Sequence, residues 1–208
     1  MIRLRLRDLE ELKKKGKGKK LLVTCNLCVN LNRYLRSEKQ RAIETEKFNK
    51  IHKGLGIAGE WVGHQICLRD PKEMKGLKET IKDYDTVYVY AEGPGVQVVS
   101  EECGIAAIPI ADTTSTGAKT ESGIKDYCML CGDCTVDETA GLCVKTRCPK
   151  GLLNGPCAGV EDGKCEVPDD NGEKNMDCIW VTVFQRMKKM DKLDDFIKTR
   201  MPKLSGSK

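Results

Sequence analysis

Apolar and polar positions between residues 21 and 112 alternate short β-branched runs with longer polar segments. Residues 21–24 form one apolar run, and Thr86–Tyr90 has the strongest strand composition in the chain. Two further strands are expected at residues 61–67 and 106–110. Because helix-favouring segments separate the strands, the pattern predicts right-handed crossovers and a parallel sheet covered by helices. We therefore expect an α/β fold, with a small flavodoxin-like or Rossmann-like parallel-sheet domain.

The polar segments between these runs favour helices. Residues 30–53 contain few β-branched residues and no proline, a composition typical of helix. Pro71 suits the first turn of a helix, which is expected to continue to residue 82. Gly93-Pro94-Gly95 leads from a strand into a short helix. Near the C-terminus, apolar residues recur at helical spacing until Pro202 ends the pattern, which predicts an amphipathic helix.

These patterns predict four parts along the chain. Residues 1–20 are a basic N-terminal arm, and residues 21–117 are the α/β domain. Residues 118–178 are a loop-rich, cysteine-rich module, and residues 179–208 are the C-terminal amphipathic helix and tail.

Composition indicates a globular protein. The chain has 208 residues, 39% of them hydrophobic, and a net charge of only +5, which argues against intrinsic disorder. The longest uncharged apolar stretch, residues 104–111, is far shorter than the roughly 18 residues of a spanning helix, so no membrane span is expected. The N-terminus alternates apolar and basic residues instead of forming a continuous apolar region, so no signal peptide is expected. These features predict a cytoplasmic protein.

Positive charge is concentrated at the N-terminus. Residues 1–20 contain nine Lys or Arg and three acidic residues. Such an arm suits an acidic partner, either nucleic acid or protein, and we expect it to be held by its own fold or by another subunit. Only 5% of the residues are aromatic and no zinc-finger or RNP pattern is present, so nucleic-acid binding is not expected.

The cysteines are numerous and unevenly placed. The chain contains 12 of them, and cytoplasmic thiols stay reduced, so metal binding is the leading explanation. Eight of the 12 fall within a window of 51 residues: Cys128, Cys131, Cys134, Cys143, Cys148, Cys157, Cys165 and Cys178. This clustering predicts a metal module in the last third of the chain.

The first three of these cysteines have the spacing of an iron–sulfur site. Cys128, Cys131 and Cys134 form a C-x2-C-x2-C run, the start of a bacterial ferredoxin motif that binds a [4Fe–4S] cluster. The motif ends in Cys-Pro, and Cys148-Pro149 follows Cys134 after 13 residues. Zinc is the main rival, although zinc sites use pairs of C-x2-C knuckles and a third cysteine is surplus. The remaining cysteines suffice for a second cluster or a zinc ion, and spacing leaves their grouping open.

A second candidate metal site lies in the α/β domain. Cys25, Cys28, Cys67 and Glu92 all fall at the predicted ends of strands, where parallel sheets form their sites. Cys25 and Cys28 form a C-x2-C pair that suits one metal. Additional zinc or a further cluster is therefore a candidate at Cys25, Cys28 and Cys67, with Glu92 beside them. Cys103 is a fourth candidate thiol.

Together these motifs resemble the methylenetetrahydrofolate reductase C-terminal family, the small MetV-type iron–sulfur subunit that accompanies a catalytic flavoprotein. The similarity extends over about residues 20–180, and its most specific segments are residues 127–134, 148–157, 163–167 and 178–180. Members of the family often carry Cys-Gly where this chain has Glu92-Gly93. Three alternatives remain for this metal site, in which Glu92 stands where the family has a cysteine. Glu92 is itself a ligand, Cys103 substitutes for the missing cysteine, or the site is lost.

The resemblance implies an electron-transfer and scaffold subunit of a methylenetetrahydrofolate reductase complex. In that role [4Fe–4S] clusters pass electrons to the flavin of a MetF-type catalytic subunit, in Wood–Ljungdahl-type one-carbon metabolism. The electron donor is then a ferredoxin or an NADH-oxidising subunit. No catalytic residue is assigned to this chain, because the hydride step belongs to the flavoprotein. The alternative is a zinc-stabilised interaction module without a redox role.

Overall fold

The structure, a computed structural model, describes residues 2–25, 38–63, 66–120, 123–169 and 172–201. The contacts within the chain divide it into two units, Met1–Thr114 and Ser115–Lys208. They are called unit 1 and unit 2 below.

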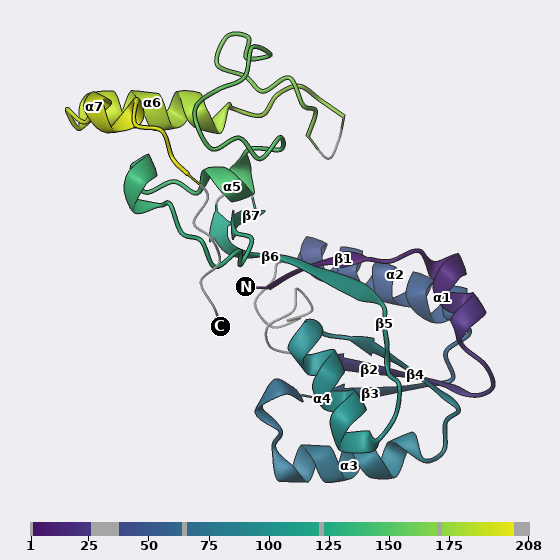
Figure 1. Ribbon diagram of the computed structural model, residues 1–208. Helices are drawn as coiled ribbons and strands as arrows, with labels where there is room; N and C mark the ends of the chain where they lie inside the picture. Colours follow the sequence, from purple (N-terminus) through teal and green to yellow (C-terminus); the bar gives the residue numbers. More distant parts are fainter. Residues whose placement is uncertain (1, 26–37, 64–65, 121–122, 170–171, 202–208) are drawn as a thin grey trace. The chain divides into compact units, whose positions relative to one another are not determined.

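Unit 1 is built on a parallel four-stranded sheet (Figure 1). Its strands are β2 (Lys20–Cys25), β3 (Gly59–Gly63), β4 (Thr86–Tyr90) and β5 (Ile108–Pro109), in the order β3-β2-β4-β5. If the four strands are renumbered 1 to 4 along the chain, their order in the sheet is 2-1-3-4, which is that of flavodoxin-like folds. The predicted α/β fold with a parallel sheet is confirmed.

Helices lie on both sides of this sheet (Figure 1). They are α2 (Glu38–Leu55), α3 (Pro71–Ile81) and α4 (Gly93–Cys103). The carboxylate of Asp70 accepts hydrogen bonds from the backbone of Lys72 and Glu73 at the start of α3, so the helix predicted from Pro71 begins there. Gly104, at φ 63°, ends α4, because glycine adopts this left-handed conformation without a steric cost.

The second strand is shorter than predicted. β3 ends at Gly63, and Cys67 lies in a separate 3₁₀ turn, η1 (Ile66–Leu68). The expected strand over residues 61–67 is therefore wrong at residues 66 and 67, while residues 64 and 65 lie outside the described residues. The fourth strand is also shorter, since β5 comprises two residues.

Burial explains why the strands of unit 1 read as continuous apolar runs. Every residue of β4 is buried, as are the last five residues of β2, because helices cover both faces of a parallel sheet. The hydroxyl of Tyr88, in the middle of β4, donates to the carbonyl of Leu12 at 2.9 Å. Burial raises the pKa of Tyr88, so this donor stays protonated.

The basic N-terminal arm is part of the fold. It forms β1 (Ile2–Leu6), which pairs with β6, and α1 (Leu9–Lys15), whose Leu12 is buried. The backbone N–H of Arg7 donates to the carbonyl of Ile110, and its guanidinium lies 2.6 Å from the Asp112 carboxylate. The arm is therefore held by contacts within its own chain.

Unit 2 consists mainly of loops between short elements. A β-hairpin that the pattern analysis missed leads into it, with β6 (Ala111–Thr120) antiparallel to β7 (Gly123–Cys128). A 3₁₀ turn, η2 (Asp137–Thr139), and a one-turn helix, α5 (Val144–Arg147), follow.

The C-terminal helix predicted to run to residue 201 is instead two helices. α6 spans Ile179–Lys189 and α7 spans Leu193–Phe196, with Asp191 between them at φ 54°. A left-handed residue cannot continue an α-helix, so the helical pattern breaks there. No helix among the described residues is both long and apolar enough to cross a membrane.

The core of unit 2 is small and centred on Trp180. Its buried members are Leu142, Val144, Cys178, Ile179, Trp180, Val183 and Met187. The indole N–H of Trp180 donates to the carbonyl of Leu152 at 3.0 Å, and its ring meets Phe196 edge to face. The guanidinium of Arg200 lies 5.6 Å from the centre of the indole ring. One aromatic side chain thus joins α6, α7 and the loop before Pro156.

Candidate functional site

Four thiols of unit 2 line one small cavity of about 20 Å³. They are Cys148, Cys157, Cys165 and Cys178. Apolar side chains, among them Leu152, Pro156, Val160 and Trp180, form much of the rest of the wall, which also includes the charged residues Arg147, Lys150 and Asp177. The volume is that of about one water molecule.

Local backbone structure brings these four thiols together from separate segments. The N–H of Cys148 donates to Val144 and closes α5, while Cys178 caps the start of α6 and donates to the carbonyl of Gly163 at 2.8 Å. Cys165 is fixed by a 2.8 Å hydrogen bond from its N–H to the carbonyl of Met176. The Gly/Pro-rich loop carries Cys157 to the same cavity.

Two cationic side chains accompany the thiols. Arg147 and Lys150 both line the cavity. The Nε of Arg147 is buried without a hydrogen-bond acceptor among the described residues, and Lys150 forms an ion pair with Glu166. An orphaned buried donor is costly unless an acceptor is supplied. A negatively charged group bound by the thiolates would be such an acceptor.

The donor set fits a thiolate-bound metal group. Four cysteines are the ligand count of both a [4Fe–4S] cluster and a tetrahedral zinc ion. Nowhere in the described ranges do three or more Cys, His, Asp or Glu side chains converge at metal-binding separations. The four thiols therefore face a common cavity without meeting at its centre. As it stands the cavity has the size of one ion, and it would widen around a cluster.

The C-x2-C-x2-C run forms a surface loop after β7. Cys128, Cys131 and Cys134 are all exposed, and Leu130 and Gly132 adopt positive φ values of 57° and 72°. The N–H of Leu130 donates to the sulfur of Cys128 at 3.3 Å. This curled backbone thus directs one amide towards a cysteine sulfur, the kind of hydrogen bond that tunes cluster sulfurs.

Two contacts tie this loop to α5. The ammonium of Lys145 donates to the carbonyl of Asp133 at 2.8 Å and pairs with its carboxylate. Arg147 lies 4.6 Å from the ring centre of Tyr127. Cys143 is the residue that caps the start of α5, so it follows the loop onto the same helix. Cys148, which the ferredoxin-like spacing joins to the loop, lines the cavity at the other end of α5.

The candidate site of unit 1 lies at the carboxyl ends of three adjacent strands. Cys25 is the last residue of β2 and is fully buried, Cys67 follows β3 in η1, and Glu92 follows β4 and precedes α4. Burial raises the pKa of the Cys67 thiol, and the Glu92 carboxylate and Cys25 raise it further. The three groups are therefore electrostatic neighbours. Cys28 lies outside the described residues.

Cys103 does not share this position. It is the last residue of α4, and Glu92 precedes the first. Eleven helical residues separate the two ends by about 16 Å. Of the three outcomes for the missing thiol, substitution by Cys103 is inconsistent with this geometry.

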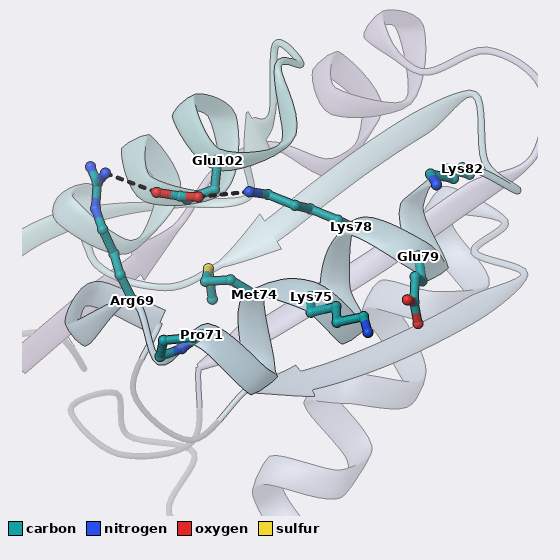
Figure 2. Close-up of a pocket in the computed structure, with 8 residues that line it drawn as sticks. All are labelled: Arg69, Pro71, Met74, Lys75, Lys78, Glu79, Lys82 and Glu102. Carbon is teal, nitrogen blue, oxygen red and sulfur yellow. Dashed lines mark hydrogen bonds and ion pairs between the residues drawn. The ribbon is translucent and has the colours of Figure 1, made fainter.

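A surface cleft of about 530 Å³ lies along α3 and α4 (Figure 2). Figure 2 shows Arg69 and Lys78 directed at the carboxylate of Glu102, at 3.0 and 2.8 Å. Lys78 and, to a smaller extent, Arg69 lower the pKa of Glu102. The charged lining of this cleft was not predicted from the sequence, because Arg69 and Glu102 are far apart in the chain. The cleft is braced by ion pairs and contains no thiol.

Comparison with known proteins identifies the second half of the chain. Residues 108–205 match the family model described as methylene-tetrahydrofolate reductase C terminal. Over these residues the chain is similar to that family. The resemblance inferred from the cysteine motifs is confirmed. No curated protein and no solved structure matches the chain.

The reductase C-terminal domain contains all eight clustered cysteines and both cations of the cavity. The match begins in β5, so the strands β2, β3 and β4 with Cys25, Cys67 and Glu92 lie before it. Lys145 and Arg147 of this domain lie between Cys143 and Cys148 in the sequence. Their roles in joining the Cys128–Cys134 loop to α5 appear only in the folded chain.

Proposed function

We propose that the protein is an electron-transfer and scaffold subunit of a methylenetetrahydrofolate reductase complex. The four-thiol cavity in the reductase C-terminal domain carries this proposal. According to this proposal, a [4Fe–4S] cluster bound at the cavity supplies one-electron chemistry. A separate MetF-type flavoprotein carries the flavin that reduces the substrate. A ferredoxin or an NADH-oxidising subunit is the proposed donor.

The ligands divide into two sets of four in this proposal. Cys148, Cys157, Cys165 and Cys178 hold one cluster at the cavity. Cys128, Cys131, Cys134 and Cys143 hold the other at the surface loop and the start of α5. The apolar wall around Trp180 excludes water from the first set, and low water access favours retention of thiolate ligands. The exposed thiols of the second set suit electron exchange with a partner protein.

Metal analysis tests the proposal directly. The full chain, purified without oxygen, is expected to be brown and to contain roughly eight irons and eight sulfides for two [4Fe–4S] clusters. Dithionite should bleach the visible absorption and produce an EPR signal. The chain should also co-purify with a MetF-type flavoprotein when the two are expressed together. A colourless protein that holds zinc and no iron contradicts the electron-transfer role.

One observation favours a second function. The cavity has room for about one ion, which suits a four-cysteine zinc site that stabilises a protein-interaction module. The same analysis separates the two functions, because zinc without iron or sulfide is the expected composition of such a module. Co-purification with the flavoprotein would then persist without any EPR signal.

Arg147 is expected to raise the midpoint potential of the cluster at the cavity. Its half-buried positive charge favours the more negative, reduced state. Arg147→Gln should lower the potential by tens of millivolts, where about 59 mV is a tenfold change for one electron. EPR-monitored titration of the full chain measures this. Arg186→Gln, at an exposed arginine of α6, is the matched control, and equal shifts in both variants would contradict the assignment.

A further inference from the structure

The surface cleft of unit 1 along α3 and α4 is lined by four basic and two acidic side chains. Three of the basic residues, Lys75, Lys78 and Lys82, belong to α3 or to its C-terminal cap. Lys75 and Lys82 are two helical turns apart, which separates them by about 10 Å along the helix axis, and Lys78 lies on the same face. The cleft thus presents a row of ammonium groups along one side of a helix (Figure 2).

Only part of this positive charge is balanced within the chain. Glu102 binds Lys78 at 2.8 Å and Arg69 at 3.0 Å, which links α3 to α4. The side chains of Lys75 and Lys82 are exposed, and neither forms an ion pair or a hydrogen bond with any described residue. These two cations are therefore available to an acidic group from outside the chain.

The rest of the lining favours a protein partner over a nucleic acid. The carboxylates of Glu79 and Glu102 lie among the cations of the cleft, and they would repel the phosphates of a nucleic acid backbone. A protein surface carries charges of both signs and apolar groups as well. Met74 lines the cleft, and Leu68, which precedes Arg69 in the chain, is 67% exposed. The cleft therefore suits an acidic protein surface.

The lining also distinguishes between two kinds of protein partner. No thiol is among the described side chains that line the cleft, so this surface contains no candidate cluster ligand. An electron donor has to approach the cysteines of the reductase C-terminal domain. A subunit that the scaffold only holds can bind at a surface without thiols. The cleft therefore suits a scaffold contact.

We propose that this cationic cleft of unit 1 binds an acidic surface of the MetF-type flavoprotein. The inference rests on the proposed scaffold function and adds the surface that holds the partner. Lys75 and Lys82 form ion pairs with carboxylates of the flavoprotein. Arg69 and Lys78 remain paired with Glu102. Because the helix fixes the spacing of the cations, the row also steers an acidic partner towards the cleft and speeds association.

Binding of the flavoprotein to the purified full chain tests this surface, with the affinity measured by isothermal titration calorimetry at low and at high salt. Lys75→Glu combined with Lys82→Glu should weaken binding at low salt roughly tenfold or more, because two attractions become repulsions. High salt should weaken binding of the wild type and not that of the double variant, since salt screens attraction and repulsion alike. Glu79→Lys adds a cation to the cleft and should tighten binding.

Lys13→Glu combined with Lys14→Glu is the matched control. It makes the same change of charge at exposed positions of α1 in the same unit, and it should bind the flavoprotein as the wild type does. Far-UV circular dichroism checks that each variant is folded. The iron content should be the same in all variants, because none of the altered residues lies in the reductase C-terminal domain.

The outcomes separate this inference from the proposed function. A wild-type chain that does not bind the flavoprotein overturns both. If the wild type binds, equal affinity of the double variant at the cleft, or an equal loss in the control, overturns the cleft alone. A double variant that loses binding to duplex DNA and keeps the flavoprotein assigns the surface to nucleic acid, and this result also overturns the proposal.

Discussion

Serine in place of Cys165 is expected to remove roughly four irons from each chain and leave the other four in place. Cys165 contributes one of the four thiols at the cavity, and serine oxygen is a poor replacement for a thiolate. The loss should also destabilise unit 2, because a metal bound only by the folded state stabilises that state.

The spectra of several variants would establish which thiols share a cluster. Cys157→Ser should give the same residual EPR signal as Cys165→Ser, since both thiols line the cavity. Cys131→Ser should remove the other cluster and leave a different signal. Cys103→Ser, outside the matched domain, is the control and should retain all the iron. Identical residual signals for Cys165→Ser and Cys131→Ser would show that the two sets are wrongly divided.

Alanine in place of Trp180 is expected to lower the free energy of unfolding of unit 2 by about 3–5 kcal/mol. The side chain is 1% exposed, and its removal leaves a cavity beside Phe196 and the four-thiol wall. The carbonyl of Leu152 also loses its indole donor. Trp180→Phe keeps most of the volume and should cost much less, about 1 kcal/mol from the lost hydrogen bond.

Hydrogen exchange measures this effect unit by unit. Amides of α6 should exchange faster in Trp180→Ala, while those of β2 and β4 keep their protection. Met190→Ala, at a half-exposed position on the end of the same helix, should change stability by no more than about 0.5 kcal/mol. If Trp180→Ala leaves α6 as protected as in the wild type, Trp180 does not organise this core.

The elements of unit 1 were predictable because their signals are local. Thr86–Tyr90 is a strand as expected, since β-branched and aromatic residues fill a sheet covered on both faces. α3 begins at Pro71, because Asp70 suits the N-cap position and the fixed φ of proline suits the first helical position. The predicted strand over residues 61–67 was too long, because its apolar content does not distinguish a strand from the turn at Ile66.

Elements of unit 2 were harder to predict. The β6–β7 hairpin is rich in threonine and charged residues, and it lacks the apolar alternation that marks a half-buried strand. The break at Asp191 depends on one left-handed residue, for which the apolar spacing of the helix contains no signal. Both errors lie at solvent-exposed positions, where the alternation of apolar and polar residues does not indicate the secondary structure.

The sequence by itself determined the chemistry of the candidate sites. Eight clustered cysteines with a C-x2-C-x2-C start predict a thiolate ligand set, because ligand type and local spacing are properties of the chain. Their family was also readable from these residues. Tertiary structure alone decided that Cys148 lines a cavity with Cys157, Cys165 and Cys178, because the loops between them have no repeating period. It also decided that Glu92 is buried with an unpaired oxygen between two strand ends, since burial and hydrogen bonding depend on residues distant in the chain.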